Sequence, residues 1–364
     1  MAQVAELVLD AAQTALRLLP WPTRPGLRRV GRPGRQSPVL ITCNYALTVR
    51  RLMRALRGLD AWVVVAPSAG VNVWCAAAGG LLTTSHVVTA LKTSGVEAEV
   101  EHRRAVLPQL AATGVVARDV ARRSGWKLRF GPVYAADIPR YLARGSDKSE
   151  DMRRVRFGAA ERMEMAAAWA LPILAVAVVA SLWLKPGWVT ALTVEVVVLA
   201  VAAFFTYDRI PWPRLAIFWA AAVGVSVAAA PAFGPAWTAP AAALSATLIV
   251  ALLTFDFDGS TPVEGGSHFE SKRWHITLDP QRCLGVFNCL AVCPEACFDA
   301  TDPARGRKAV LAHSERCVKC GACVVQCPRD ALFFTDAEGA RIEPQSIRRY
   351  KLNLLGARGV DTGA

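Results

Sequence analysis

Ten cysteines are the residues of this 364-residue chain whose type and spacing most clearly predict chemistry. Eight of them fall between Cys283 and Cys327, a clustering that is typical of iron–sulfur ligands and not of a disulfide framework. The densest run is Cys317-x2-Cys320-x2-Cys323-x3-Cys327-Pro328. Thiolates at this spacing bind iron–sulfur clusters, whereas a zinc ribbon does not use three evenly spaced cysteines followed by Cys-Pro. The run therefore predicts an iron–sulfur site in a reducing compartment.

Residues 274–334 form an internal repeat with a period of 34. This is the signature of bacterial two-cluster ferredoxins, in which the last cysteine of each run ligates the other cluster. Four thiolates are then available to cluster II, which we expect to be a [4Fe–4S] cluster: Cys293, Cys317, Cys320 and Cys323.

Cluster I has an incomplete set of ligands. Val286 stands where the repeat predicts a cysteine, and this leaves Cys283, Cys289 and Cys327. Three thiolates suit a [3Fe–4S] cluster or an incompletely ligated [4Fe–4S] cluster. Cys297 lies four residues beyond Cys293, so we expect it near cluster II and not near the missing ligand.

A second candidate site lies in residues 70–79, where one cysteine is surrounded by small side chains. Asn72 is a favourable helix N-cap and places Cys75 at the third helical position, where free backbone N–H groups and the helix dipole favour an anion. Residues 76–78 leave little side-chain bulk around the sulfur, so that a large flat ligand could approach the helix. The pattern alone also allows Cys75 to be a small buried hydrophobe.

The sequence around Cys75 resembles the corrinoid protein of microbial mercury methylation, the HgcA family. The likeness covers about residues 37–158 and is carried by these blocks: 37–45, 60–62, 71–77, 102–104, 107–115, 131–133 and 152–157. It implies that Cys75 is catalytic, as the lower axial ligand of the corrinoid cobalt. It also implies that the cofactor is contacted by the cap helix, and we expect further contacts after the last strand: Asn72, Val73, Trp74, Cys75, Ala76, Ala77, Gly131, Pro132 and Val133.

The resemblance further implies a methyltransferase that moves a methyl group from thiolate-ligated cobalt to Hg(II). A thiolate below cobalt favours departure of the methyl group with its electrons, and the chain lacks the Asp-x-His-x-x-Gly motif of histidine-ligated corrinoid proteins. The ferredoxin portion resembles the partner ferredoxin of the same pair, the HgcB family, and is expected to re-reduce the cobalt to Co(I). The implied partners are an Hg(II)-thiol complex or another methyl acceptor, a methyl donor protein or methyl-folate, and an upstream electron donor.

Two departures from the family concern the methyl acceptor. The cap helix of the family continues Ala-Ala-Gly-Lys, whereas this chain has Ala76-Ala77-Ala78-Gly79 and lacks the lysine. The ferredoxin of the family carries further cysteines after its second cluster and at its C-terminus, whereas residues 329–364 contain none. Two alternatives stay open: the same corrinoid chemistry with a different acceptor, or a membrane iron–sulfur electron-transfer protein without a corrinoid.

Short apolar runs alternate with helical stretches between residues 38 and 145. We expect strands at residues 39–42, 61–66, 96–101 and 127–130, and helices at residues 48–57, 85–92, 117–123 and 137–144. The alternation predicts an α/β domain with a largely parallel sheet. In such sheets ligands bind beyond the carboxyl ends of the strands, and Cys75 follows the strand that ends at Ala66.

Four apolar spans of about 20 residues predict a transmembrane domain: residues 166–184, 187–206, 215–233 and 236–255. A hydrophobic content of 53% and a mean hydropathy of +0.30 agree. The net charge of +13 indicates basic segments that flank the spans on the cytoplasmic side, beside anionic lipid of the inner membrane. We therefore expect both ends of the chain in the cytoplasm. No nucleic-acid motif accompanies the charge. Glu195, in the second span, is a candidate for binding protons or cations, or a hydrogen-bonded structural residue.

The predicted organisation has six parts. A helix and basic arm (1–36) precede the corrinoid-binding α/β domain (37–160) and the four-helix transmembrane domain (165–256). A linker (257–272), an α+β two-cluster ferredoxin (273–340) and a C-terminal tail (341–364) follow.

Overall fold

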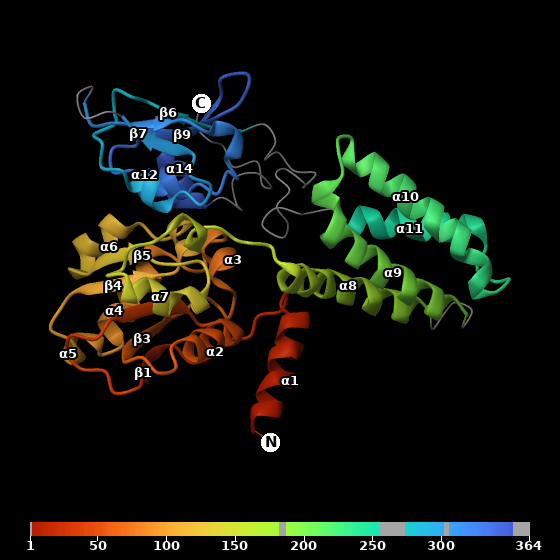
Figure 1. Cartoon of the computed structure of the whole chain (residues 1–364), viewed down its shortest axis with the longest axis horizontal. Helices are drawn as coiled ribbons and strands as arrows, with labels where there is room; N and C mark the ends of the chain where they lie inside the picture. The colour runs from red at the N-terminus through yellow and green to blue at the C-terminus, as the bar shows by residue number, and fades with distance from the viewer. Residues whose placement is uncertain (1, 182–186, 255–273, 302–305, 352–364) are drawn as a thin grey trace. The chain divides into compact units, whose positions relative to one another are not determined.

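The computed structural model describes residues 2–181, 187–254, 274–301 and 306–351 and divides into two compact units (Figure 1). One unit contains residues 1–18 and 156–272, and the other contains residues 19–155 and 273–364. The α/β and ferredoxin portions, which are far apart in the sequence, therefore belong to one unit. The predicted linker at residues 257–272 lies outside the described residues.

The α/β portion is built on a five-stranded sheet with the order β1-β3-β2-β4-β5. β2 (Val39–Cys43), β3 (Ala61–Ala66), β4 (Arg104–Leu107) and β5 (Lys127–Phe130) run parallel, whereas β1 (Gly26–Val30) pairs antiparallel with β3. Every residue of β2 and β3 is buried, as expected of central strands that are covered on both faces. The structure thus has the predicted α/β class with a largely parallel sheet.

Two parts of the sheet differ from the prediction. β1 lies within the segment predicted to be a basic arm and forms the edge of the sheet instead. The strand predicted at residues 96–101 is wrong, because Val96–Glu99 is the short helix α5 and the strand follows as β4. Glu97 accepts a hydrogen bond from Trp126 Nε1 at 2.8 Å, which anchors α5 to the start of β5 and keeps it out of the sheet.

Helices cover both faces of the sheet. α4 (Thr84–Thr93) and α6 (Ala117–Ser124) share a core with the side chains of one face, including Ile41. α2 (Ala46–Ala55) and α7 (Ile138–Ala143) pack with the side chains of the other face. This layered arrangement leaves the carboxyl ends of the parallel strands, where a ligand site is expected, at one edge of the sheet.

Two small sheets form the ferredoxin portion. β6 (His275–Leu278), β9 (Leu332–Thr335) and β10 (Arg341–Ile342) make an antiparallel sheet with the order β10-β9-β6. β7 (Phe298–Ala300) pairs with β8 (Ala309–Leu311). The predicted α+β character of this portion agrees with the structure.

Three short α-helices lie in the described residues of the ferredoxin portion. α12 (Asn288–Val292) and α13 (Ala322–Gln326) occupy equivalent positions in the two repeats. α14 (Pro344–Tyr350) lies in the segment predicted to be a C-terminal tail, and its Ile347 is fully buried in the ferredoxin core. The ferredoxin therefore extends further along the chain than residue 340.

The other unit is helical, and three of its helices are long and apolar enough to cross a membrane. The fourth predicted span is α11, whose 15 residues give a length of about 22 Å, less than the roughly 30 Å of a bilayer core. All four predicted helices are present, and within the described residues three meet the length of a span. The third of these, Arg214–Phe233, reaches 20 residues because α10 continues into the 3-10 helix η5 (Ala230–Phe233). The described helices of this unit are α1 (Ala2–Ala15), α8 (Ala159–Ser181), α9 (Gly187–Thr206), α10 (Arg214–Ala229) and α11 (Ala239–Leu253).

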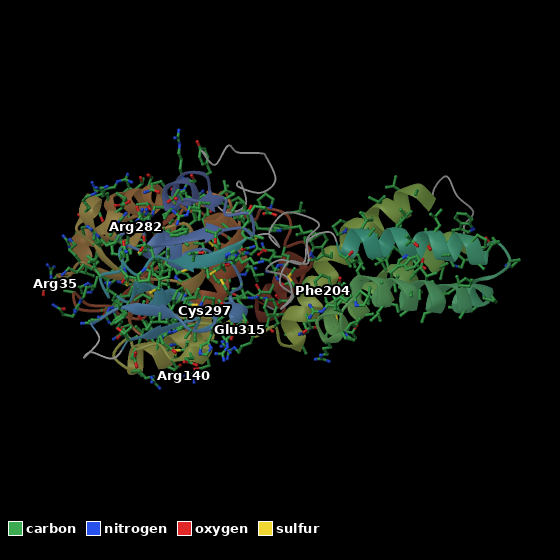
Figure 2. All side chains as sticks on the ribbon, turned by 90° about the horizontal axis from the view of Figure 1, so that it is seen from above. Arg35, Arg140, Phe204, Arg282, Cys297 and Glu315 are labelled. Atoms are coloured by element: carbon green, nitrogen blue, oxygen red, sulfur yellow. The ribbon has the colours of Figure 1, made fainter. Side chains whose placement is uncertain are left out.

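Two acidic side chains connect these helices. The Arg162 guanidinium forms a two-point ion pair with Asp208, at 2.9 and 2.7 Å. It also donates to the carbonyl of the buried Phe204, the residue labelled in Figure 2. Glu195 is buried and accepts a hydrogen bond from Ser245 Oγ of α11 at 2.5 Å. The second contact joins α9 to α11, in agreement with the structural interpretation of Glu195.

Candidate functional site

Cys75 lies at the start of α3 (Val73–Ala78), as the sequence predicts. The Asn72 side chain caps the helix by accepting a hydrogen bond from the Cys75 backbone N–H at 3.0 Å. Its amide group also donates to Cys75 Sγ at 3.4 Å. The thiol is exposed, so the interpretation of Cys75 as a small buried hydrophobe is wrong. The cysteine offers its sulfur to a ligand from outside the helix.

The other residues of α3 divide between its two sides. Val73, Ala76 and Ala77 are buried, whereas Trp74 is partly exposed next to Cys75. A Cβ atom added at Gly114 would lie 2.5 Å from the Ala77 carbonyl oxygen. The small residues therefore allow the next segment to pack closely behind the helix, and do not surround the sulfur as we expected. Of the contacts proposed within this helix, the exposed side holds Trp74 and Cys75.

The loop that precedes α3 is held by a buried asparagine after β2. Asn44 Oδ1 accepts hydrogen bonds from Ser68 N, Ser68 Oγ and Gly70 N at 2.9, 2.9 and 3.0 Å. Its amide nitrogen donates to the Thr23 carbonyl oxygen at 3.1 Å. Gly70 has φ +71°, and a Cβ atom there would lie 2.5 Å from Pro22 N. This network, which the sequence did not reveal, sets the position of α3 at the carboxyl edge of the sheet.

Replacing Asn44 with alanine is expected to destabilise the α/β portion by about 2–4 kcal/mol, because it leaves buried backbone donors of residues 68 and 70 unsatisfied. Asn44→Asp keeps the acceptor oxygens and loses the donor to Thr23, so its loss should be smaller. Thermal unfolding of the full chain measures both effects. Equal midpoints for Asn44→Ala and the wild type would contradict the assignment.

The segment after β5 has a different role from the one expected. Gly131 and Pro132 are buried, and Val133 is partly buried. Gly131 N donates to Leu107 O at 2.7 Å, and a Cβ atom at Gly131 would lie 2.6 Å from Val106 Cγ1. Gly131 and Pro132 thus pack β5 against β4 at the carboxyl edge of the sheet. A direct cofactor contact from them is limited by their burial.

Five cysteines line one cavity of the ferredoxin portion, around Cys297 in Figure 2. Four of them are the predicted ligands of cluster II, and the fifth is Cys297, where the sequence placed it: Cys293, Cys297, Cys317, Cys320 and Cys323. The Cys297 backbone N–H donates to Cys293 Sγ at 3.3 Å. The hydrogen bond from the Cys297 thiol lowers the pKa of Cys293 to about 6. This donor set fits a [4Fe–4S] cluster, because its cysteines share a cavity and one sulfur already receives N–H donation.

The thiols predicted for cluster I also lie close together. Burial, with smaller contributions from the charges of Cys283 and Cys327, raises the pKa of Cys289 to about 12. Backbone N–H groups of Ala309 and Ala331 donate to Cys283 Sγ and Cys327 Sγ at 3.5 and 3.3 Å. Mutual repulsion of this kind is relieved when the thiolates bind a cation, so the three cysteines fit a metal cluster.

The loop around Val286 keeps the backbone of a ligand loop although the cysteine is missing. Gly285 and Phe287, on either side of Val286, have φ +64° and +61°. Their equivalents beside Cys320 are Lys319 and Gly321, with φ +50° and +68°. The Val286 side chain is 52% exposed. The first repeat therefore lacks only the sulfur and not the loop that would present it.

The α/β and ferredoxin portions meet along residues 109–118, which we call the docking segment. Gln109 Nε2 donates to Val292 O at 2.6 Å. Gln326 Nε2 donates to the carbonyls of Ala112 and Val115, both at 2.7 Å. The docking segment begins with the 3-10 helix η1 (Gln109–Thr113), which also contacts α3. One short segment thus lies against both the helix that bears Cys75 and the helices α12 and α13, which contain the predicted cluster ligands Cys289 and Cys323.

A partly buried lysine supports this contact. Lys148 Nζ donates to Gln109 Oε1 and to Phe130 O, the latter at 2.8 Å. Burial lowers the pKa of Lys148 to about 7, with a smaller contribution from Arg153. An unfolded lysine has a pKa of about 10.4, so between these values the unfolded chain binds the additional proton.

We therefore expect the free energy of unfolding to rise as the pH increases from about 7 to about 10. Lys148→Met should remove this part of the pH dependence, whereas Lys127→Met, at an exposed lysine, should retain it. Thermal unfolding midpoints measured across that pH range test the prediction. Parallel pH profiles for Lys148→Met and the wild type would contradict it.

The fold and the site together define an α/β domain that has an exposed cysteine in the first turn of a capped helix. This domain is joined to a ferredoxin of the iron–sulfur type. Residues 312–333 match the family of 4Fe-4S binding domains, which agrees with the assignment of the second cysteine run. Residues 17–142 match the family described as the CO dehydrogenase/acetyl-CoA synthase delta subunit. This match begins before residue 37 and includes β1, in agreement with the structure.

Known proteins similar to about a third of this chain include subunits of acetyl-CoA decarbonylase/synthase complexes. The acetyl-CoA decarbonylase/synthase complex subunit gamma of Methanopyrus kandleri is 34% identical over 125 residues, 34% of this chain and 27% of the relative. The corresponding subunit of Archaeoglobus fulgidus is 34% identical over 125 residues, 34% of this chain and 26% of the relative. Subunit gamma 2 of Methanosarcina mazei is 35% identical over 118 residues, 31% of this chain and 25% of the relative. The matching region thus spans about a quarter of each relative.

Proposed function

We propose that this chain is a membrane-anchored, corrinoid-dependent methyltransferase with a fused ferredoxin. The observation that carries the proposal is the exposed thiol of Cys75 at a capped helix start, beyond the carboxyl ends of a parallel sheet. The match of residues 17–142 to the CO dehydrogenase/acetyl-CoA synthase delta subunit family, together with the similarity of the chain to subunit gamma of the acetyl-CoA decarbonylase/synthase complex, supports methyl-transfer chemistry in this domain. Three helices of sufficient length support an anchor in the cytoplasmic membrane.

Cys75 is the residue that would hold the cofactor. A bound corrinoid would supply a methyl group that leaves cobalt with its electrons, and a cobalt centre that the clusters of the ferredoxin re-reduce. The Cys75 sulfur would donate electron density to the bound group, and the amide group of Asn72 at 3.4 Å orients that sulfur. Partly exposed Trp74 would lie beside the same ligand face. Presence of the ferredoxin in the same chain keeps the electron donor at high effective concentration.

Hg(II) is the acceptor that we propose, from the resemblance of residues 71–77 to the mercury-methylation cap helix. The test is an anaerobic single-turnover assay in which the full chain is loaded with methylcobalamin and mixed with thiol-bound Hg(II). Formation of methylmercury by the wild type, and not by Cys75→Ala, is the expected result. Methylcobalamin uptake without methylmercury would overturn mercury as the acceptor while leaving the corrinoid assignment intact. Failure to take up methylcobalamin would overturn both.

A second candidate keeps the cobalt chemistry and changes the acceptor. It is favoured by the absence of cysteine from residues 329–364, since no thiol in this part of the sequence can deliver Hg(II). The similarity to acetyl-CoA decarbonylase/synthase subunits favours it too. Loss of the methyl group from the loaded protein to a thiol or to another methyl acceptor, without added Hg(II), would support this candidate.

A further inference from the structure

Three arginines of the α/β portion bind the ferredoxin next to its predicted cluster ligands. Arg153 Nη1 donates to Leu290 O at 2.7 Å, and Leu290 follows Cys289. Arg118 Nη1 donates to Pro328 O at 2.6 Å, and Pro328 follows Cys327.

The third arginine completes the pattern on the other cluster. Arg154 Nε donates to Pro294 O at 3.3 Å, and Pro294 follows Cys293. Each guanidinium therefore contacts a carbonyl that is one residue away from a thiolate ligand. We call Arg118, Arg153 and Arg154 the arginine clasp.

The charge of the clasp is only partly balanced by carboxylates. Arg154 pairs with Glu295 of the ferredoxin at 3.3 Å, and Arg118 lies 4.0 Å from Asp119. No carboxylate pairs with Arg153 within the part of the chain that the structure describes. Its Nε atom is buried without a hydrogen-bond partner there. The docking surface thus presents excess positive charge to cysteines that bind anionic clusters when loaded.

We propose that the arginine clasp links docking of the ferredoxin to reduction of its clusters, so that the reduced ferredoxin is held more tightly than the oxidised one. One-electron reduction by an external reductant adds one negative charge to a cluster. Only the electron is transferred, and no atom is gained or lost. Positive charge nearby stabilises that added charge, most strongly where solvent is excluded. Docking therefore raises the reduction potential, and reduction must strengthen docking by the same free energy.

The proposal does not rest on methyl transfer or on the identity of the acceptor. It assigns a role to the neutral contacts as well. Gln109 and Gln326 bond to backbone groups and carry no charge, so they fix the register of docking in both redox states. The arginines alone provide the difference between the states.

Redox titration of the full chain, followed by EPR of the clusters, tests the proposal. The triple variant Arg118→Gln, Arg153→Gln, Arg154→Gln removes the clasp charge. The matched control is Arg57→Gln, Arg104→Gln, Arg144→Gln, which removes the same number of charges from exposed positions of the same domain. We expect the clasp variant to lower the midpoint potentials and the control to leave them unchanged. If the docking equilibrium constant of the reduced ferredoxin, relative to that of the oxidised ferredoxin, falls tenfold, the midpoint potential falls by about 59 mV for one electron.

Amide hydrogen exchange provides an independent readout. In the wild type, residues 109–118 should exchange more slowly after reduction with dithionite than after oxidation, and the clasp variant should lose this difference. If the triple variant contains less iron than the wild type, the single variant Arg118→Gln is used in its place. The Arg118 side chain is 44% exposed, so its replacement should leave the fold intact. Restoration of the potential by Arg118→Lys would support a role of charge. Unchanged potentials and equal exchange in both redox states would overturn the proposal.

Discussion

Cys75→Ala is expected to abolish the thiolate–cobalt absorption of the corrinoid-loaded protein and to lower methyl transfer by roughly 100-fold or more. Loss of groups that only orient metal ligands costs about 10–100-fold, and this substitution removes the proposed ligand itself. The fold should tolerate the change, since the thiol is exposed and surface substitutions cost about 0.5 kcal/mol or less. Absorption spectra and iron content, measured on the same preparation, separate loss of the ligand from loss of folding.

Cys43→Ala is the control for removal of a thiol from the same domain. Cys43 is fully buried in the sheet core, so its replacement should lower stability and keep the cobalt absorption. Asn72→Ala removes the helix cap, which costs about 1 kcal/mol, and the contact to Cys75 Sγ. A shifted absorption in that variant is expected. Unchanged spectra in Cys75→Ala would rule out the ligand assignment.

Val286→Cys is expected to complete cluster I. The residues on either side of Val286 already have the left-handed conformation of the Cys317–Cys320–Cys323 loop, so a cysteine there would present its sulfur without a change in the backbone. The exposed valine contributes little packing. We expect the air-oxidised wild type to show the EPR signal of a three-iron cluster and the variant to lose it. Iron content should rise by about one atom per chain.

Leu284→Cys is the matched control for Val286→Cys. Leu284 is 60% exposed and corresponds to Val318, which is not a ligand position in the second repeat. A cysteine there adds a thiol to the same loop out of register, and it should leave the three-iron signal unchanged. Loss of the signal in both variants would point to nonspecific capture of iron. Persistence of the signal in Val286→Cys would contradict the assignment of the missing ligand.

The sequence by itself determined the features that depend on local spacing. The run from Cys317 to Cys327 and the capped position of Cys75 follow from residues close together in the sequence, and the missing ligand at Val286 follows from comparison of that run with its copy 34 residues earlier. The apolar helices follow from hydropathy over single segments. The parallel strands β2 and β3 are similarly local, because strands buried on both faces are continuously apolar.

Tertiary structure decided where non-local contacts outweigh local pattern. Residues 26–30 lie in an arginine-rich segment without a clear strand pattern, but they become a strand because the edge of β3 offers hydrogen bonds across 31 or more residues of sequence. Ala76 and Ala77 face the interior because Gly114 and η1 pack behind α3. No spacing rule could predict that Gln326 would bond to Ala112, since 214 residues separate them. The docking segment and its arginine clasp exist only because folding brings two remote portions of the chain together, and their hydrogen bonds are satisfied by backbone groups that carry no sequence signature.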